Sequence, residues 1–515
     1  MQSYNESLQP FLKRRKSFCL LFLVAFTIVY SVKPGKCQSR LTSGSDEEFN
    51  KIYFNAIVPV VSCQIINAPG PTPEDLTISY TIVTPFPEFH SDRTVHVDRN
   101  GRFSIELEYS FPYQQIWLTI DKYFYSAILA NKGLSITFDL TKLKRKPVEF
   151  SGEGVSYRGP DAALNEWLGR SMLYTANEMD KVPEDLPLDS LYKIKGRIDH
   201  AFATENPSGF EWLSENERMS NYYSRLLHAA YISGKQPILW DAIKAHKPYL
   251  ISNNGMTFVR SLYSYYVNVA SKLNLNNYSV RKEVRELDSL FGEPLANLLK
   301  LQIFRDDPKD NALILKDLIA ETQTQWVREV LKKRYETACK HLREVDSILK
   351  DAKPLAGNLL VGEHPESLSF GAQLSILPDM EAKDFLAKLK RAYPGKTIIL
   401  DLWATWCKPC ISQMAYSKEL YRLSSDLPVQ FVYLCSNKDS DISKWKNKIA
   451  EFRQPGIHFF TGHKLVEELM AMVNTASFPT YICLAPSGKI VPNAIKSMSA
   501  TNIDDIKRLV NADEI

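Results

Sequence analysis

The chain has 515 residues, 44% hydrophobic and 24% charged, which is the composition of an ordinary globular protein with material for about three domains. Its net charge is only +4, and Lys and Arg are scattered along it, so the charge pattern argues against a nucleic-acid partner. Eight cysteines in so long a chain do not make a disulfide scaffold, and the widely separated ones are expected to be small buried hydrophobic residues.

The N-terminus carries the pattern of an export signal. A basic block, Lys13–Lys16, precedes the apolar run Phe18–Val32. This run is shorter than the ~17–25 residues of most membrane-spanning helices. Residues 1–39 are therefore interpreted as either a cleaved signal peptide or an uncleaved membrane anchor. The rest of the chain is expected in the cell envelope, on the periplasmic side, where disulfide chemistry is permitted.

Residues 45–155 have the pattern of short strands. The stretches 76–83, 102–109 and 115–120 alternate or run apolar with β-branched and aromatic residues, and the Asn100-Gly101 turn between strands is a hairpin signal. Evenly spaced strands without helical periodicity predict an N-terminal antiparallel β-sandwich. His90 and His96 lie in this region and are interpreted as exposed polar residues rather than metal ligands.

Residues 156–352 change to a helical pattern. Apolar residues recur at helical spacing, as at Leu164, Trp167 and Leu168, and Pro and Gly breaks divide the region into antiparallel helices. This pattern predicts a central all-α region. The aromatic run at 263–266 is interpreted as packing between helices rather than as a ligand site.

Residues 353–515 alternate strand and helix signals, which predict a partly parallel α/β sheet. A linker and an edge hairpin at 354–378 come first. The expected strands are 398–403, 429–434, 480–484 and 489–491, and the expected helices are 381–392, the segment after Cys410, 441–452 and 503–510.

Cys407 and Cys410 stand where the strand 398–403 meets the following helix. Because a helix start has unpaired N–H groups and about +0.5 of a charge, the pKa of a thiol placed there should fall below its ordinary value of ~8.5. Pro409 is tolerated in the first turn and stiffens it, and the cation of Lys408 should stabilise a Cys407 thiolate. The pattern predicts a working dithiol/disulfide centre.

Two other sites could use these cysteines, a zinc site and a peroxidase site. A zinc site needs two further ligands at matching spacing, and the nearest downstream histidines, His458 and His463, are distant in the chain. No metal and no cofactor are therefore expected. A thiol peroxidase is a weaker alternative, because the chain has no Thr-x-x-Cys-type peroxidatic site.

Further residues make the motif specific. Asp401 lies inside the apolar strand, where burial should raise the carboxyl pKa and let it exchange a proton with Cys410. The alternative is a purely structural buried aspartate with a hydrogen-bond partner. Phe478-Pro479-Thr480 precedes a strand and suits a cis X–Pro turn against the disulfide, which would leave neighbouring backbone free to pair with an extended substrate.

The segment Asp401–Cys410 together with Phe478-Pro479-Thr480 resembles thioredoxin. The exported context and the Pro-Ser-Gly-Lys-Ile hairpin that begins at Pro486 are similar to its membrane-associated TlpA/ResA branch. The resemblance covers about residues 362–515 and implies a C-terminal α/β thioredoxin-like fold. The regions before it resemble those fused to such domains in Bacteroidetes envelope proteins. Lys408 and the helix expected at 381–392 depart from the usual pattern.

The resemblance implies an extracytoplasmic reductase or isomerase of disulfides. Cys407 would be the attacking thiolate and the more exposed sulfur, and Cys410, deprotonated with help from Asp401, would resolve the mixed disulfide. Trp406 and Pro479 would shape the docking surface. The implied partners are disulfide-bearing envelope proteins and a membrane electron donor of the DsbD/CcdA type. The alternative is an envelope binding or scaffold protein whose first two domains recognise a protein or glycan, with an auxiliary redox domain.

Overall fold

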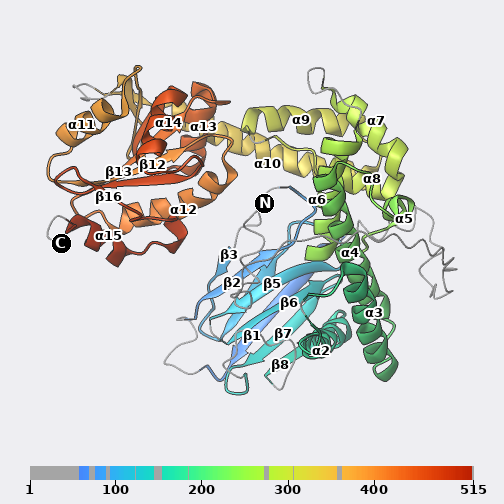
Figure 1. Cartoon of the computed structure of the whole chain (residues 1–515). Coiled ribbons are helices and arrows are strands. Elements are labelled where there is room, and N and C mark those ends of the chain that lie inside the picture. The colour runs from blue at the N-terminus through green and yellow to red at the C-terminus, as the bar shows by residue number, and fades with distance from the viewer. Residues whose placement is uncertain are drawn as a thin grey trace. The chain divides into compact units, whose positions relative to one another are not determined.

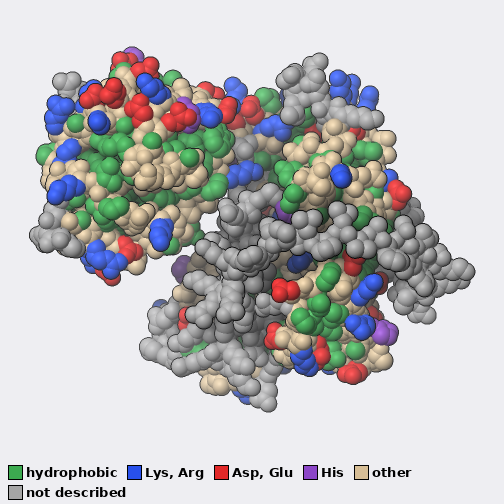
Figure 2. Space-filling model, in the orientation of Figure 1, with side chains coloured by type: hydrophobic (Ala, Val, Ile, Leu, Met, Phe, Trp, Pro, Cys, Tyr) green, Lys and Arg blue, Asp and Glu red, His purple; other side chains and the backbone are tan. Residues whose placement is uncertain are grey.

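The computed structural model describes residues 57–68, 76–87, 93–121, 123–143, 154–183, 185–271, 278–305, 307–355 and 362–512. The predicted signal or anchor at 1–39 and His90 lie outside these residues. No helix within these ranges combines the length and the apolar character that crossing a bilayer demands. On the face shown in Figure 2, Lys and Arg side chains are interspersed with Asp and Glu.

The first part of the chain is a β-sandwich, as predicted (Figure 1). Its strands are β1 (Val60–Ile66), β2 (Ile78–Ile82), β3 (Arg93–Val95), β4 (Arg102–Glu106), β5 (Gln114–Ile120), β6 (Phe124–Ala130), β7 (Leu134–Asp139) and β8 (Val155–Arg158). One sheet has the order β4-β1-β7-β8 and the other β3-β2-β5-β6. Alternate side chains of both sheets are buried in one shared hydrophobic core.

The pairing within the sandwich departs from the predictions in two places. β1 and β7 pair in parallel, whereas the other strand pairs of the two sheets are antiparallel. The Asn100-Gly101 turn exists, and Gly101 has φ +75°, with the Ile65 carbonyl oxygen where a Cβ would lie. The hairpin interpretation is wrong, because β3 pairs with β2 and β4 pairs with β1 in the other sheet. Alternation alone cannot show which sheet a strand joins.

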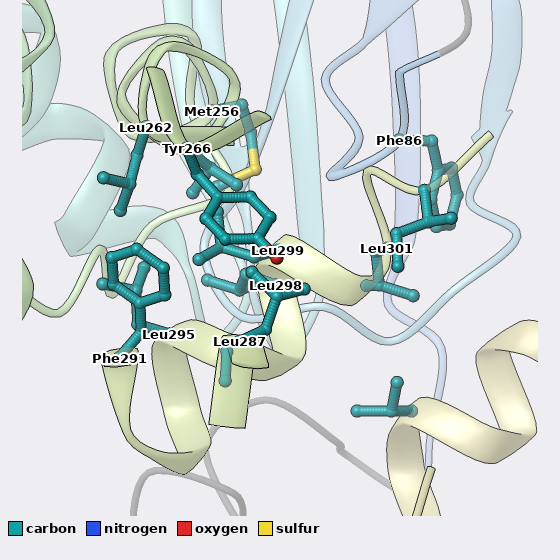
Figure 3. Packing of buried hydrophobic residues seen from close by; sticks show 14 of the residues in the cluster. Phe86, Met256, Leu262, Tyr266, Leu287, Phe291, Leu295, Leu298, Leu299 and Leu301 are labelled. Atoms are coloured by element: carbon teal, nitrogen blue, oxygen red, sulfur yellow. The ribbon is translucent and has the colours of Figure 1, made fainter. Parts of the chain in front are cut away.

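The middle of the chain is helical, as predicted. It contains α2 (Ala162–Met179), α3 (Leu188–Glu205), α4 (Glu211–Ser233), α5 (Trp240–Ala245), α6 (Asn253–Tyr265), the π-helix η3 (Tyr266–Ala270), α7 (Val280–Phe291), α8 (Glu293–Lys300), α9 (Pro308–Glu321) and α10 (Gln325–Lys350). The apolar faces of α4 to α10 form a large core that also takes in Val83, Phe86 and Phe111 of the sandwich part. Figure 3 shows part of this core, with Phe86. Trp167 of α2 and Phe202 of α3 belong to a separate, smaller core. Tyr265 and Tyr266 are buried in the large core, in agreement with the packing interpretation.

The last part of the chain is an α/β domain around an eight-stranded sheet, as predicted. Its elements are β9 (Lys353–Pro354), β10 (Glu363–Ser367), β11 (Ala372–Ile376), α11 (Ala382–Ala392), β12 (Thr397–Trp403), α12 (Lys408–Leu423), β13 (Val429–Ser436), α13 (Ile442–Phe452), β14 (Gly456–Thr461), α14 (His463–Met472), β15 (Thr480–Leu484), β16 (Ile490–Val491), the 3-10 helix η5 (Met498–Ala500) and α15 (Ile503–Val510). The strand order is β16-β15-β12-β13-β14-β11-β10-β9. The elements β14 and α14 have no counterpart among those predicted from the sequence.

The strand β12 organises this domain. All seven of its residues are buried, and it pairs in parallel with β13 and antiparallel with β15. Ile399 and Trp403 belong to the core on the face that α12, α13 and α15 cover, whereas Ile398 and Leu400 belong to the core under α11 and α14. Because side chains alternate along a strand, Asp401 faces α12, the helix that begins at the cysteine pair.

Candidate active site

The cysteine pair occupies the start of α12, directly after the end of β12. Cys407 is the N-cap residue of the helix, and its Sγ accepts a hydrogen bond from the backbone N–H of Cys410 at 3.1 Å. The two cysteines are joined in a disulfide whose Cα atoms are 5.3 Å apart. The first turn therefore directs an N–H donor and the positive end of the helix dipole at Cys407 Sγ.

The two cysteines of the disulfide have nearly equal exposure. Cys407 is 3% exposed and Cys410 is 2% exposed, so both are buried in the disulfide form. Both side chains pack in the hydrophobic core that also contains Trp403 and Met414. The expectation that Cys407 carries the more exposed sulfur therefore stays a prediction for the reduced pair. What distinguishes the two cysteines here is their place in the helix, one at the N-cap and one inside the first turn.

The two residues between the cysteines are exposed. Lys408 is the first residue of α12, and Pro409 follows it within the first turn, where a proline costs no hydrogen bond. The Lys408 cation is thus carried at the start of α12, beside Cys407 in the chain.

An aromatic and proline surface lies beside the disulfide. The Phe478–Pro479 peptide bond is cis, and the Phe478 ring meets the half-exposed Trp406 ring edge-on, with 5.7 Å between centroids. Thr480 begins β15 and pairs with Leu402 of β12. Because the two strands are antiparallel, Pro479 lies at the end of β12 that leads into the cysteine pair.

Asp401 lies in the sheet behind this helix start. Its side chain is buried, and its Oδ1 has no hydrogen-bond partner. In the sheet it pairs with Tyr433 of β13 and Tyr481 of β15. Burial raises the pKa of Asp401 from its ordinary value of 3.8 to about 8. The alternative, a structural aspartate held by a hydrogen bond, is not supported at Oδ1, because this oxygen has no hydrogen-bond partner.

A polar cluster continues from Tyr433, next to Asp401. The Tyr433 hydroxyl lies 2.7 Å from Ser417 Oγ of α12 and accepts a hydrogen bond from Gln454 Nε2 at 2.6 Å. The His458 ring stacks on the Tyr433 ring at 4.6 Å, and burial lowers the pKa of His458 to about 3. The imidazole is therefore neutral at physiological pH. His463 is engaged elsewhere, through Nδ1 with Ser436 Oγ at 2.8 Å.

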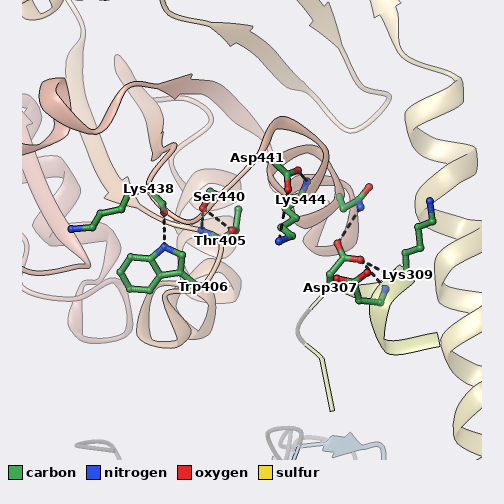
Figure 4. A network of polar contacts seen from close by, with 10 residues as sticks. Asp307, Lys309, Thr405, Trp406, Lys438, Ser440, Asp441 and Lys444 are labelled. Atoms are coloured by element: carbon green, nitrogen blue, oxygen red, sulfur yellow. Dashed lines mark hydrogen bonds and ion pairs between the residues drawn. The ribbon is translucent and has the colours of Figure 1, made fainter. Parts of the chain in front are cut away.

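Sequence reasoning missed a set of contacts on the other side of Trp406. The Trp406 indole N–H donates to the Lys438 carbonyl oxygen at 2.7 Å, and Thr405 Oγ1 lies 2.7 Å from Ser440 Oγ (Figure 4). Lys438 and Ser440 belong to the turn between β13 and α13. A short polar turn carries no periodicity, so no sequence signal linked it to the cysteine pair.

The remaining described cysteines fit the expected role with one exception. Cys63, Cys435 and Cys483 are buried, and burial raises the pKa of each thiol. Cys339 on α10 is partly exposed, so it is not a core residue. His96, expected to be an exposed polar residue, is exposed.

The comparisons with known proteins concern a quarter or so of the chain. Residues 367–510 match the Redoxin family. The thiol-disulfide oxidoreductase ResA of Bacillus thuringiensis (strain Al Hakam) is 27% identical over 130 residues, 25% of this chain and 70% of the relative. ResA of Bacillus subtilis (strain 168) is 25% identical over 153 residues, 29% of this chain and 80% of the relative. A solved thioredoxin domain of a thiol-disulfide oxidoreductase from Bacteroides vulgatus is 22% identical, with a TM-score of 0.20, and the match covers 24% of this chain and 81% of that one.

Proposed function

We propose that this protein, a thiol–disulfide oxidoreductase whose C-terminal domain is thioredoxin-like and of the TlpA/ResA type, reduces or isomerises disulfides of envelope proteins outside the cytoplasm. The observation that carries the proposal is the Cys407–Cys410 disulfide at the N-terminus of α12. Asp401 buried behind it and the cis proline Pro479 beside it supply the proton acceptor and the docking site that such an exchange needs.

The reaction begins from the reduced pair. The Cys407 thiolate, stabilised at the start of α12, attacks one sulfur of a substrate disulfide. That disulfide breaks, one substrate thiolate leaves and takes up a proton, and Cys407 is held in a mixed disulfide with the other substrate sulfur.

The second cysteine completes the exchange. Asp401, in its ionised form, takes the proton of the Cys410 thiol, and the Cys410 thiolate attacks Cys407 Sγ. The mixed disulfide breaks, the second substrate thiol is released, and the 407–410 disulfide forms. Two electrons have passed from the enzyme to the substrate. A membrane electron donor of the DsbD/CcdA type would return two electrons and two protons to the pair.

The proposed location rests on the sequence and on redox chemistry. The basic block Lys13–Lys16 followed by the apolar run Phe18–Val32 has the layout of an export signal, whether cleaved or kept as an anchor. Protein disulfides persist in the compartments beyond the membrane and are rare in the cytosol, so a substrate for Cys407 is abundant there.

The residues around the pair have proposed roles that follow from their positions. The surface against which an extended substrate segment lies is formed by Trp406, Phe478, Pro479 and Thr480. Trp406 and Phe478 pack ring against ring beside Cys407, and Pro479 directly precedes β15. Lys408 and Pro409 tune the pair, through a cation beside Cys407 and a stiff first turn.

A trapping experiment tests the proposal. In Cys410→Ser the second step cannot occur, so mixed disulfides through Cys407 should accumulate and appear as dithiothreitol-sensitive adducts with envelope proteins. The matched control is the double variant Cys407→Ser/Cys410→Ser, in which no adduct should form. The proposal is lost if the single variant traps no partner and the reduced wild-type protein does not reduce insulin disulfides.

A second role is favoured by one observation. The sandwich and the helices share a hydrophobic core that contains no residue of the thioredoxin-like domain. The first two domains can therefore serve as a recognition unit for an envelope protein or glycan, attached to a redox domain with cores of its own.

A further inference from the structure

The indole of Trp406 is held from one side by the turn Asn437–Ser440, here named the 437–440 loop. Its N–H donates to the Lys438 carbonyl oxygen at 2.7 Å (Figure 4). The ring also packs edge-on against the Phe478 ring, with 5.7 Å between the centroids. Trp406 is 44% exposed, so a large hydrophobic residue is accessible to solvent directly before Cys407.

The residue before Trp406 is held by the same loop. Thr405 is buried, its Oγ1 lies 2.7 Å from Ser440 Oγ, and its backbone N–H donates to Ser440 Oγ at 3.3 Å. One hydroxyl group therefore contacts both the side chain and the backbone of Thr405. Thr405 and Trp406, the two residues that precede the attacking cysteine, are fixed by three hydrogen bonds to one short loop.

The loop itself is anchored to the sheet. The Asn437 backbone N–H donates to the Thr461 carbonyl of β14 at 2.9 Å, and the Lys438 backbone N–H donates to Ser436 Oγ at 3.1 Å. The Ser440 backbone N–H donates to the Asn437 carbonyl at 3.2 Å. Asp439 has φ +55°, a left-handed conformation that closes the turn. A loop held in this way can fix the position of another group rather than follow it.

We propose that Ser440 is a positioning residue, which holds Thr405 and thereby keeps Trp406 against Phe478 as one wall of the substrate-docking surface. The inference rests on the proposed function and names its substrate class. An exposed aromatic wall beside a disulfide favours protein segments that carry an apolar side chain next to the disulfide to be reduced. A small soluble disulfide makes no use of the wall, so Ser440 should matter for protein substrates alone.

The test compares two substrates of the full-length protein. With insulin as the protein disulfide and dithiothreitol as the reductant, Ser440→Ala should raise KM about three- to tenfold, the loss expected when one or two hydrogen bonds are removed. The kcat value should stay within about twofold. The rate at which the reduced protein cleaves bis(2-hydroxyethyl) disulfide, a small disulfide without an aromatic ring, should also be unchanged. Ser440→Thr keeps the hydroxyl group and should restore the wild-type KM.

Two controls separate positioning from general destabilisation. Ser424 lies at the far end of α12, is buried, and donates to the Leu420 carbonyl at 2.7 Å. Ser424→Ala removes a comparable hydrogen bond and should leave KM for insulin unchanged. In a Trp406→Phe background, which lacks the indole N–H, the further change Ser440→Ala should have little effect on KM, because the two residues act through the same wall.

The results distinguish a failure of the proposed function from a failure of the role assigned to Ser440. A wild-type protein that reduces neither insulin nor the small disulfide overturns the proposed function, and the role of Ser440 with it. A wild-type protein that reduces both, with Ser440→Ala no different from Ser424→Ala, overturns the inference and leaves the proposed function standing. The inference is also overturned, and the proposed function stands, if the effects of Ser440→Ala and Trp406→Phe on KM are additive. An equal slowing of both substrates by Ser440→Ala has the same consequence.

Discussion

Asp401 is a carboxyl group in surroundings that oppose its ionisation. Its partners in the sheet register are Tyr433 and Tyr481, and its Oδ1 has no hydrogen-bond partner. Burial raises its pKa to about 8, and burial, with a further contribution from Asp401, also raises the pKa of each of the two tyrosines. A carboxyl with a pKa near neutral pH is suited to taking and returning a thiol proton.

The raised pKa has a consequence for stability. In the folded protein Asp401 stays protonated up to about pH 8, whereas in the unfolded chain it ionises near its ordinary value of 3.8. Between these values the folded state binds more protons, so the free energy of unfolding falls as the pH rises through this window. Asp401→Asn cannot ionise. At about pH 8.5 it should be more stable than the wild type, by on the order of 2–4 kcal/mol.

Urea denaturation of the oxidised protein at several pH values checks this expectation. The gain of Asp401→Asn should shrink toward zero near the ordinary pKa of an aspartate. Asp426→Asn, a change at an exposed aspartate of the same domain, is the control and should follow the wild type at every pH. A gain for Asp401→Asn that does not vary with pH would contradict the raised pKa.

The site residues that lie in one continuous segment could be predicted from that segment, and Phe478, Pro479 and Thr480 were found through the resemblance to thioredoxin. The remaining residues, which reach the site only through strand register, could not be predicted. Asp401, Cys407 and Cys410 belong to one strand-to-helix segment, so their relation can be read directly from it. Tyr433 and Ser440 reach the site only because β13 pairs with β12 and ends beside it. Nothing in the spacing of these residues along the chain shows that pairing.

At the scale of elements, the unpredicted pair β14 and α14 completes the sheet. β14 pairs in parallel with both β13 and β11. It therefore joins the strands β16, β15, β12 and β13, which lead to the cysteine pair, to the edge strands β11, β10 and β9. Its six residues are all buried and follow Pro455. A short buried strand has no alternation of polar and apolar residues, which is the signal that identified the strands of the sandwich.

The start of β14 yields a prediction about packing. Gly456 has φ +110°, and a Cβ added there would lie 2.9 Å from Tyr433 Cε2 and 3.1 Å from the Phe431 carbonyl oxygen. Gly456→Ala should therefore lower the free energy of unfolding by about 2–4 kcal/mol, through backbone strain and overpacking together. Urea denaturation measures this loss.

The matched control separates the two causes. Gly395 also has a positive φ, +74°, but an added Cβ would meet nothing within 4 Å. Gly395→Ala should cost only about 1 kcal/mol, from the backbone conformation alone. Equal losses at the two positions would show that the contact with Tyr433 is relieved by small shifts and does not constrain the ring beside Asp401.

At the scale of the whole molecule, the cores divide the chain into a front part and a redox part. The sandwich and helices have their own hydrophobic clusters, and the thioredoxin-like domain has two more, one on each face of its sheet. The end of α10 is an exception, because Ile348, Leu349 and Ala352 pack against the core under α12. The redox part therefore needs these residues to be complete.

This division predicts the behaviour of a truncated protein that begins at residue 340 and so keeps Ile348, Leu349 and Ala352. Because the sheet, the cysteine pair and the 437–440 loop are retained, its kcat with insulin should lie within about threefold of the full-length value. If the front part recognises the partner, the truncated Cys410→Ser variant should trap fewer envelope proteins than the full-length variant. If both variants trap the same set of proteins, the front part does not take part in recognising the partner.

The central claim is that Cys407 and Cys410 form a reversible dithiol/disulfide pair whose reduction potential is that of a reductase or isomerase. Equilibration of the protein in dithiothreitol or glutathione redox buffers, followed by thiol alkylation and mass measurement, gives the reduction potential directly. The account predicts one two-electron transition between the ~−270 mV of thioredoxin and the ~−180 mV of protein disulfide isomerase. A potential near the ~−120 mV of DsbA, or a pair that shows no reversible transition, would contradict it.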